Sequence, residues 1–437
     1  MLTTLKNAFK IKEIRQKILF TFAMLVVIRI GSQLPTPGIN AAVFKQWFEQ
    51  QTAGAFSFFD AITGGSFTSM AILALGINPY ITSSIIMQLL TIAIPKLEEM
   101  QRDGEDGRKK IVSLTRYVTV ILALIQSTAM AIGFGRQGYL TEYNAFGVIT
   151  IIATLTAGSA FLMWVGEQIT EKGIGNGISI VLVINIISRL PQDLANLFDQ
   201  FVFGKVIGRA ILGAVIIVAI IVAMVILVII LNDATRKIPV QYAKKVQGRK
   251  MVGGQTSNIP LKVNTSGVIP VIFAQSIMQF PIIICSFVGY QGTGFWGEVL
   301  KGLNSDNWCK PSDLIYSIGL LVYIALIIFF AYFYTSITFN PLMIADNLKK
   351  QGGFIPGIRP GKPTSDYLDK VLNYVVFIGA VGLTIISIIP FFFNGVFGAS
   401  VSFGGTSLII IVSVILETVK QVESQMLVRN YKGFLED

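Results

Sequence analysis

The most informative absence in this sequence is histidine, which occurs nowhere among the 437 residues. Histidine is the commonest metal ligand, the usual proton carrier near neutral pH and the base of Ser-His-Asp catalysis, so the histidine-based forms of these chemistries are excluded. Cysteine is also scarce: Cys285 falls in an apolar stretch and Cys309 in a predicted external loop. Two such residues make no disulfide framework. We therefore expect no metal ion, no cofactor and no enzymatic activity.

Charge is the second scarcity, because 14% of the residues are charged whereas 53% are apolar. The stretch 210–231 carries no charge at all, and a helix crosses a bilayer with about 20 apolar residues. Comparable runs predict ten membrane spans, at about 18–34, 71–95, 111–134, 148–169, 174–190, 206–231, 266–288, 313–339, 369–390 and 406–428.

The centres of these spans are almost free of ionisable groups. The few present lie toward span ends, where long side chains can reach the membrane interface. Ion-coupled transporters and pumps usually carry intramembrane carboxylates, so that class is disfavoured. The ionisable residues near span ends are Arg29, Glu167, Arg189, Arg209 and Glu417.

Lysine and arginine are distributed unevenly between the loops. The N-terminal arm and the loops at 96–110, 232–265 and 340–370 are basic, whereas most of the intervening connections carry few cations or none. Basic loops of membrane proteins stay in the cytoplasm. We therefore predict a multi-pass membrane protein with both termini and the basic loops on the cytoplasmic side.

One hydrophobic segment, 56–95, starts, stops and starts again. Its first part, 56–65, is too short to cross a bilayer, and Gly64 and Gly65 end it. The chain then resumes in an apolar run interrupted by Gly76-Ile-Asn-Pro79. Non-helical backbone at membrane depth persists only where protein or a water-filled cavity surrounds it. The segment therefore predicts a cavity within the membrane part of the molecule.

Hydroxyl and amide side chains replace charges inside the spans. Two groups of them, at 82–88 and 275–279, lie close to prolines, and proline kinks a helix. Ordinary hydrogen bonding between helices, worth about 0.6–2 kcal/mol per contact, explains any single one of these residues. The two groups together favour a second interpretation, a weakly polar seam between two kinked helices that can open.

The two long basic loops exceed what a compact channel needs. We expect a β-hairpin around Gly248 in the first loop, and a short helix followed by a non-helical stretch at 352–363 in the second. Membrane topology and attraction to anionic lipid explain such loops without a partner. Arg249 and Arg359, beside glycine and proline, also suit a phosphate backbone or an acidic protein face, and we favour docking of a large cytosolic partner. The candidate docking residues are Arg236, Lys244, Lys245, Arg249, Lys250, Lys349, Lys350, Arg359 and Lys362.

Ten short strings, in order along most of the chain, resemble the SecY family, whose members form the central pore of the bacterial Sec protein translocase. The strings are LPTPGI (34–39), ALGINPYI (74–81), GEDGR (104–108), FLMWVGEQIT (161–170), GIGNGIS (173–179), PLKVN (260–264), GVIP (267–270), ADNLKK (345–350), PGIRPG (356–361) and FGGTS (403–407).

The resemblance implies an all-α polytopic membrane fold, with ten transmembrane helices in two inverted, pseudo-symmetric halves at 1–190 and 205–437. It also implies a short re-entrant plug helix at about 56–65. The function implied is a passive protein-conducting channel in the bacterial cytoplasmic membrane. Secretory polypeptides would pass across, and transmembrane segments would leave sideways into the lipid.

The resemblance also assigns residues to a ring, a plug and a lateral gate. Bulky apolar rings obstruct ions by excluding water; Leu182 stands where this family often has isoleucine. The pore ring would be Ile77, Ile81, Ile178, Leu182, Ile272 and Ile410. The plug would contain Phe58, Phe59, Ile62, Thr63, Gly64 and Gly65. The lateral gate would contain Ser83, Ser84, Gln88, Gln126, Gln275, Ser276 and Gln279.

The partners implied by the resemblance supply the energy, since the chain has no Gly-x-x-x-x-Gly-Lys-Ser/Thr phosphate loop. They are the SecE and SecG subunits, the SecA motor, the ribosome with the RNA and proteins at its exit tunnel, signal peptides, nascent chains and membrane lipid.

Two other functions remain open from the residues alone. A secondary transporter could bind a small solute at a discontinuous helix, although the shortage of span carboxylates weighs against it. A membrane docking platform without a pore would explain the basic loops, but it leaves the interrupted segment 56–80 without a purpose.

Overall fold

The computed structural model describes residues 9–51, 60, 62–203, 207–242, 245–247, 250–252, 256–288, 294–311, 313–397 and 405–432. Within these residues each of the ten predicted spans corresponds to a helix of 16 residues or more. These helices are α2 (Lys12–Gly31), α5 (Asn78–Ala93), α7 (Glu105–Arg136), α8 (Ala145–Lys172), α9 (Gly177–Phe201), α10 (Ile207–Asp233), α11 (Ile269–Val288), α13 (Ile318–Thr338), α15 (Lys362–Phe397) and α16 (Gly405–Lys432).

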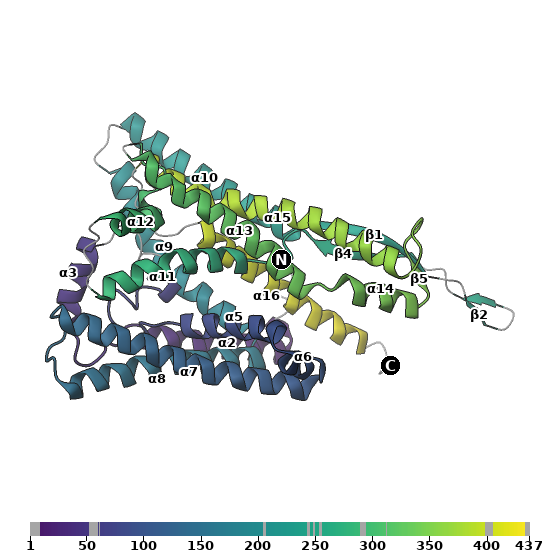
Figure 1. Cartoon of the computed structure of the whole chain (residues 1–437), viewed down its shortest axis with the longest axis horizontal. Coiled ribbons are helices and arrows are strands. Elements are labelled where there is room, and N and C mark those ends of the chain that lie inside the picture. Colours follow the sequence, from purple (N-terminus) through teal and green to yellow (C-terminus); the bar gives the residue numbers. More distant parts are fainter. Residues whose placement is uncertain are drawn as a thin grey trace.

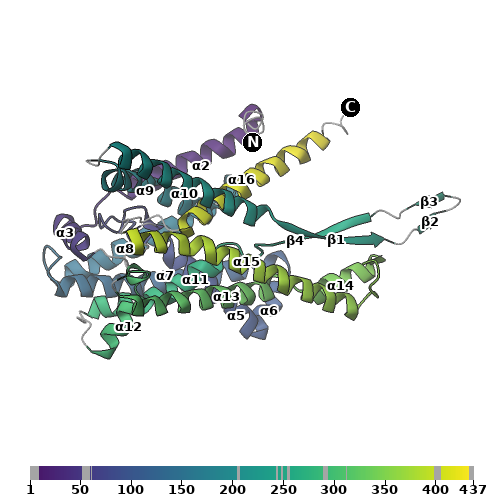
Figure 2. The ribbon, with the colours of Figure 1, turned by 90° about the horizontal axis from the view of Figure 1, so that it is seen from above.

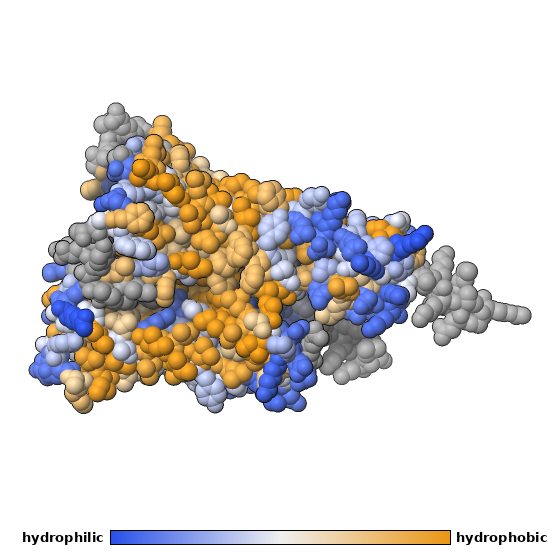
Figure 3. Space-filling model, in the orientation of Figure 1, coloured by the Kyte–Doolittle hydropathy of each residue, from blue (hydrophilic) through white to orange (hydrophobic). Residues whose placement is uncertain are grey.

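Six helices of the described chain are long and apolar enough to cross a membrane, and a seventh is reached if a bent pair counts as one span. The bent pair is α5 with α6 (Pro95–Arg102), which meet at 107°. By this measure α2, α11 and α16 fall short. On the face shown in Figure 3, an apolar band nevertheless covers the middle of the molecule, with hydrophilic surface toward both ends. The chain is therefore a mostly helical, multi-pass membrane protein.

Several helix boundaries differ from the predicted ones: α2 and α7 begin earlier than 18 and 111, and α5 begins later than 71. α9 continues to Phe201, beyond the predicted end at 190, with Pro191 inside it. α15 likewise continues to Phe397 past Pro390. The stretch 352–363 was expected to be non-helical, but α15 begins at Lys362, because proline is well tolerated in the first turn of a helix.

The helices gather into two groups that lie side by side. Figure 1 shows α2, α5, α7 and α8 on one side, and α10, α13 and α15 on the other. Within the groups α7 packs on α5 and α8, and α13 packs on α11 and α15. The groups are joined through α9, which touches α8, α10 and α16, and through α11, which touches α7. The centre of the molecule lies between these groups.

The end of the molecule that carries the basic loops contains the β structure. β1 (Thr235–Tyr242) pairs antiparallel with β4 (Thr256–Lys262) and, at its far end, with β5 (Gly353–Phe354). Beyond them β2 (Lys245–Gln247) pairs with β3 (Lys250–Val252), which confirms the predicted hairpin around Gly248. We call β1 to β4 together the hairpin; it projects away from the helices (Figure 2).

A small core of its own supports the hairpin. Ile238 and Val240 alternate with exposed residues along β1, as expected for a strand with one buried face. They pack with Leu261, Leu348 and the first part of α15. Leu348 belongs to α14 (Pro341–Lys350), the predicted short helix, which Asn340 caps by accepting a hydrogen bond from the Met343 amide (3.2 Å). The two basic loops therefore form one structural unit.

The opposite end carries short helices and aromatic clusters. α3 (Ala41–Gln51) places Phe44 edge-on against Phe67 and Phe134. In the other group α12 (Phe295–Leu303), η1 (Ser305–Asn307) and η2 (Leu314–Ser317) surround Trp308, which packs on Tyr323. Both ends of the described chain lie toward the hairpin, away from α3 and α12 (Figures 1 and 2).

A close backbone approach fixes α8 against the interrupted segment. A Cβ atom on Gly158 would lie 2.1 Å from the carbonyl oxygen of Ile72. We therefore expect Gly158→Ala to destabilise the protein by about 1–3 kcal/mol, the usual cost of overpacking. The measurement is the apparent Tm of the purified protein in detergent. Gly302→Ala is the matched control, because its Cβ would meet nothing within 4 Å; equal Tm values for the two variants would contradict the predicted close approach.

Candidate functional site

The interrupted segment runs through the centre of the molecule in a non-helical conformation. Between Gly64 and Ile77 the chain forms successive turns. Part of it pairs with the chain after α2: the Thr36 amide donates to the Met70 carbonyl (2.9 Å) and the Ile72 amide donates to the Leu34 carbonyl (2.9 Å). Protein groups thus satisfy this backbone, as the absence of water at membrane depth requires.

All six residues assigned to the pore ring belong to one apolar cluster at this centre. Ile77 is the residue just before α5 and Ile81 lies in its first turn, while Ile178 and Leu182 lie on α9. Ile272 comes from α11 and Ile410 from α16. The exposed fractions of Ile77, Ile410 and Leu182 are only 1%, 3% and 7%. The helices therefore meet at one apolar cluster, in which Ile81, Ile178 and Ile272 are half-buried.

A helix cap positions the α9 contribution. In the structure the Asn176 side chain accepts hydrogen bonds from the amides of Ile178 (3.1 Å) and Ser179 (3.4 Å). Asparagine is among the best N-cap residues. α9 therefore starts just before Ile178, which places Ile178 and Leu182 on one face.

The predicted plug lies directly against this cluster. Asp60, Ile62 and Thr63 are helical, and Ile62, 4% exposed, packs among the cluster side chains. Phe58 and Phe59 lie outside the described residues. Gly64 has φ +68°, and a Cβ atom there would lie 2.9 Å from backbone atoms of Asn185. Only glycine combines that conformation with that space.

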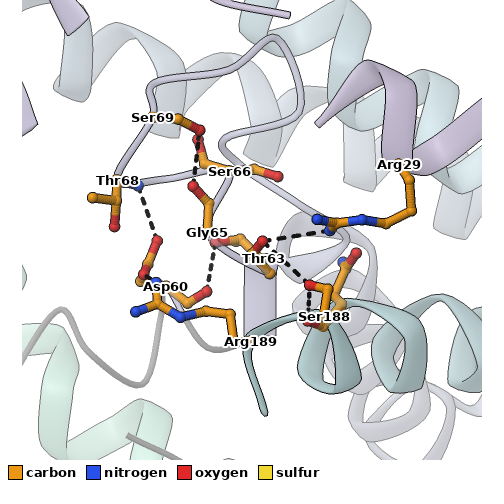
Figure 4. Close-up of polar contacts among 11 residues, drawn as sticks. Arg29, Asp60, Thr63, Gly65, Ser66, Thr68, Ser69, Ser188 and Arg189 are labelled. Carbon is orange, nitrogen blue, oxygen red and sulfur yellow. Dashed lines mark hydrogen bonds and ion pairs between the residues drawn. The ribbon is translucent and has the colours of Figure 1, made fainter. Parts of the chain in front are cut away.

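An ion pair joins the plug to α9. Asp60 pairs with Arg189, and their side chains point toward one another (Figure 4). The Asp60 side chain is 1% exposed, and its Oδ1 also accepts a hydrogen bond from the Thr68 amide (2.9 Å). The Gly65 amide donates to the Asp60 carbonyl (3.1 Å). Asp60 thus connects the short helix, the following turns and α9.

Arg29 contacts the end of the plug, where its Nη1 donates a hydrogen bond to the Gly64 carbonyl oxygen (3.4 Å). The Ser188 hydroxyl lies at the same distance from that oxygen. The expectation that Arg29 and Arg189 reach the membrane interface is therefore wrong: both turn inward to the plug. Glu167 also turns to a partner, accepting a hydrogen bond from Arg116 of α7 (2.8 Å). Glu417 is exposed, whereas Arg209 has no described side chain.

Three of the residues assigned to the lateral gate are buried, and the other four are exposed or half-buried. Ser83 is buried and donates to the Thr115 carbonyl of α7 (2.7 Å). Gln275 accepts from the Tyr323 hydroxyl of α13 (3.3 Å), and Gln279 lines a cavity of about 10 Å³ with Tyr323 and Trp308. Ser83 therefore bonds α5 to α7, and Gln275 bonds α11 to α13. Gln88 and Ser276 are exposed, and Ser84 and Gln126 are half-buried.

Most of the candidate docking residues that can be placed are exposed at the hairpin end. Arg236, Lys349, Lys350, Arg359 and Lys362 are all exposed. Lys245 and Lys250 lie on β2 and β3. Lys244 and Arg249 fall outside the described residues.

Sequence reasoning missed Asp60, although a signal was present. Asp60 is the single charged residue between Glu49 and Lys96. A lone carboxylate in an apolar stretch of a membrane protein needs a partner, because an unpaired charge at that depth is costly. Arg189 near the end of the fifth predicted span was the available cation, but nothing in the spacing connects it to Asp60.

Comparison with known proteins gave consistent matches. A family model described as SecY matches residues 71–419. The protein translocase subunit SecY of Streptomyces scabiei is 43% identical over 450 residues, with 100% of both chains covered.

Two solved structures share the fold at low identity. One, described as showing that the plug domain of the SecY protein stabilises the closed state of the translocation channel and maintains a membrane seal, has a TM-score of 0.64 at 18% identity, covering 94% of this chain and 92% of that chain. The other, Sec61 in the canine ribosome-channel complex from the endoplasmic reticulum, has a TM-score of 0.59 at 17% identity, with the same coverage.

The Asp60–Arg189 pair should control the stability of the plug. Removing one partner of a fully buried ion pair costs about 3–5 kcal/mol, and less here because the Arg189 side chain is 20% exposed. We expect Asp60→Asn to raise hydrogen exchange of the amides in 62–71 by about tenfold or more. Arg189→Gln should do the same, and the double variant should be no worse than either single one.

The matched control for this measurement is Glu298→Gln, which removes an exposed carboxylate paired with Lys301 near the end opposite the hairpin. It should leave exchange in 62–71 unchanged. Wild-type exchange in both Asp60→Asn and Arg189→Gln would contradict a stabilising role for the pair.

Proposed function

This chain belongs to the SecY family of protein translocase subunits, and we propose that it conducts polypeptides through the apolar cluster at its centre. The observation that carries the proposal is the convergence of six aliphatic side chains from α5, α9, α11 and α16 on one point. Such a ring obstructs ions by excluding water, and it offers no charge or hydrogen bond to hold a passing chain. A channel for many different sequences needs both properties.

We propose that the plug closes this channel at rest. Ile62 packs in the same apolar cluster as the ring residues, and the Asp60–Arg189 pair holds the helical residues next to Ile62. The relative described as having a plug domain that stabilises the closed state supports the same role here. Displacing the plug requires breaking the ion pair and the contacts of Gly64. Opening therefore costs free energy, which the partners must supply.

We propose that transmembrane segments leave sideways between α5 and α7 on one side and α11 on the other. Hydrogen bonds from Ser83 to α7 and from Tyr323 to Gln275 make each side a tied pair of helices. α7 and α11 are in contact. A seam between two internally bonded pairs can separate without breaking the bonds within each pair. The exposed Gln88 and Ser276 would face the departing segment.

We propose that the hairpin end docks the ribosome or the SecA motor in the cytoplasm of a bacterial cell. The exposed cations of this end suit RNA phosphates or an acidic protein face. The Sec61 relative is described in a ribosome-channel complex. SecE and SecG would complete the translocase, signal peptides and nascent chains would be its cargo, and the two halves, 1–190 and 205–437, would be inverted repeats.

The ring proposal predicts the effect of a polar substitution. Ile410 is 3% exposed, so Ile410→Asn should draw water into the constriction and weaken the seal. We expect export of substrates with defective signal sequences to rise about tenfold or more, because roughly 1.4 kcal/mol of lost closed-state stability is worth that factor. Export of a reporter with a defective signal measures this. Ile410→Leu, which keeps the ring apolar, is the control; equal export by the two variants would remove Ile410 from the seal.

The docking proposal predicts the effect of a charge reversal. The exposed Arg359 side chain has no described ion partner, so Arg359→Glu should spare the fold. It should slow motor-driven translocation about tenfold or more, as expected when a charged contact is reversed at an interface. The rate of protein import into vesicles measures this. Arg136→Glu, an exposed reversal near the opposite end, should have no effect. Normal import by Arg359→Glu would exclude Arg359 from the docking surface.

A further inference from the structure

A chain of polar side chains, one buried and two half-buried, lies at the base of the cytoplasmic hairpin. Asn264 donates from Nδ2 to Oδ1 of Asn232 (2.9 Å), and Asn232 donates from Nδ2 to the hydroxyl of Ser413 (2.7 Å). Asn264 is 7% exposed. The three residues come from three separate segments: the end of α10, the loop between β4 and α11, and α16.

Each of these residues is close in sequence to a part with a proposed function. Asn232 is three residues before β1, and Asn264 is two residues after β4, so both strands of the hairpin lead directly into the amide chain. Asn264 is also five residues before α11, which carries Ile272 of the ring. Ser413 lies three residues after Ile410 on α16, on the same side of that helix.

The hairpin is built to transmit a displacement to this point. β1 and β4 are paired without interruption from Thr235 with Lys262 to Gln241 with Thr256. The Val263 amide continues the pairing by donating to the Ala234 carbonyl (2.9 Å). A continuous ladder tilts as one ribbon, so movement at its far end reaches its base, where the two asparagines lie.

We propose that Asn232, Asn264 and Ser413 form a polar coupler, through which docking at the hairpin repositions the ring residues on α11 and α16. The three are positioning residues: they hold the ring helices relative to the hairpin and do not touch the cargo. This inference rests on the proposed function of ring and hairpin. Partly buried amides suit the task, because a hydrogen-bonded polar network favours one specific arrangement of the segments that it joins.

The experiment measures ion flux through the complete translocase in lipid vesicles, with and without ribosomes that carry a stalled, signal-bearing chain. Ser413→Ala and Asn264→Ala should bind these ribosomes as tightly as the wild type in co-sedimentation. Ribosome-induced flux should nevertheless fall about threefold to thirtyfold, the range of typical coupling energies. A merely structural role would not separate binding from opening in this way.

Ser127→Ala is the matched control, because it removes a buried hydroxyl contact between α7 and α8 (3.0 Å to Thr156) that is remote from the hairpin. It should keep full ribosome-induced flux. The coupler is refuted if Ser413→Ala and Asn264→Ala also keep full flux, if they lose ribosome binding, or if Ser127→Ala loses flux equally.

A further variant separates failure of the coupler from failure of the proposed function. Ile410→Asn should conduct without ribosomes, alone and combined with Ser413→Ala, since it opens the ring directly. If Ile410→Asn does not conduct, the ring is not the constriction and the proposed function fails. If Ile410→Asn conducts while Ser413→Ala keeps full ribosome-induced flux, only the coupler fails.

Discussion

The rest of the structure depends on one constraint: non-helical backbone at membrane depth must find its hydrogen-bond partners within the protein. The turns between Gly64 and Ile77 are such backbone, and they are enclosed by the chain after α2, by α8 and by α9. These turns lie where the two groups of helices meet. Such a centre suits the proposed channel, because the irregular backbone is enclosed by protein and does not face lipid.

Charge and apolar packing have separate tasks at this centre. The proposed ring is entirely aliphatic, a composition that seals by excluding water and binds nothing tightly. The charges of Asp60, Arg189 and Arg29 contact the proposed plug. In the proposed function, release of the plug therefore breaks these polar contacts and the apolar contacts of Ile62, while the ring keeps its apolar surface for the passing chain.

The sequence predicted much of this arrangement, because periodic and compositional signals are local. Apolar runs located all ten helices, and Gly64 and Gly65 marked the end of the plug helix. Ile272 and Ile410 were assigned to the ring from the family resemblance alone, because no spacing rule connects them to the other ring residues. Long-range polar contacts could not be predicted from local signals, because only the fold brings Asp60 to Arg189. Ser83 and Gln275 form hydrogen bonds to Thr115 and Tyr323. Buried polar groups are usually paired in this way, but the sequence does not name the partner.

The most direct test of the central claim is to crosslink a secretory chain stalled in transit to single cysteines at Ile77, Ile178 and Ile272. The background would carry Cys285→Ser and Cys309→Ser, and a cysteine at Leu321, 66% exposed on α13, would serve as the control. A central pore predicts crosslinks from all three ring positions and none from Leu321. A stalled chain that never reaches the ring positions, or reaches Leu321 equally well, would contradict it.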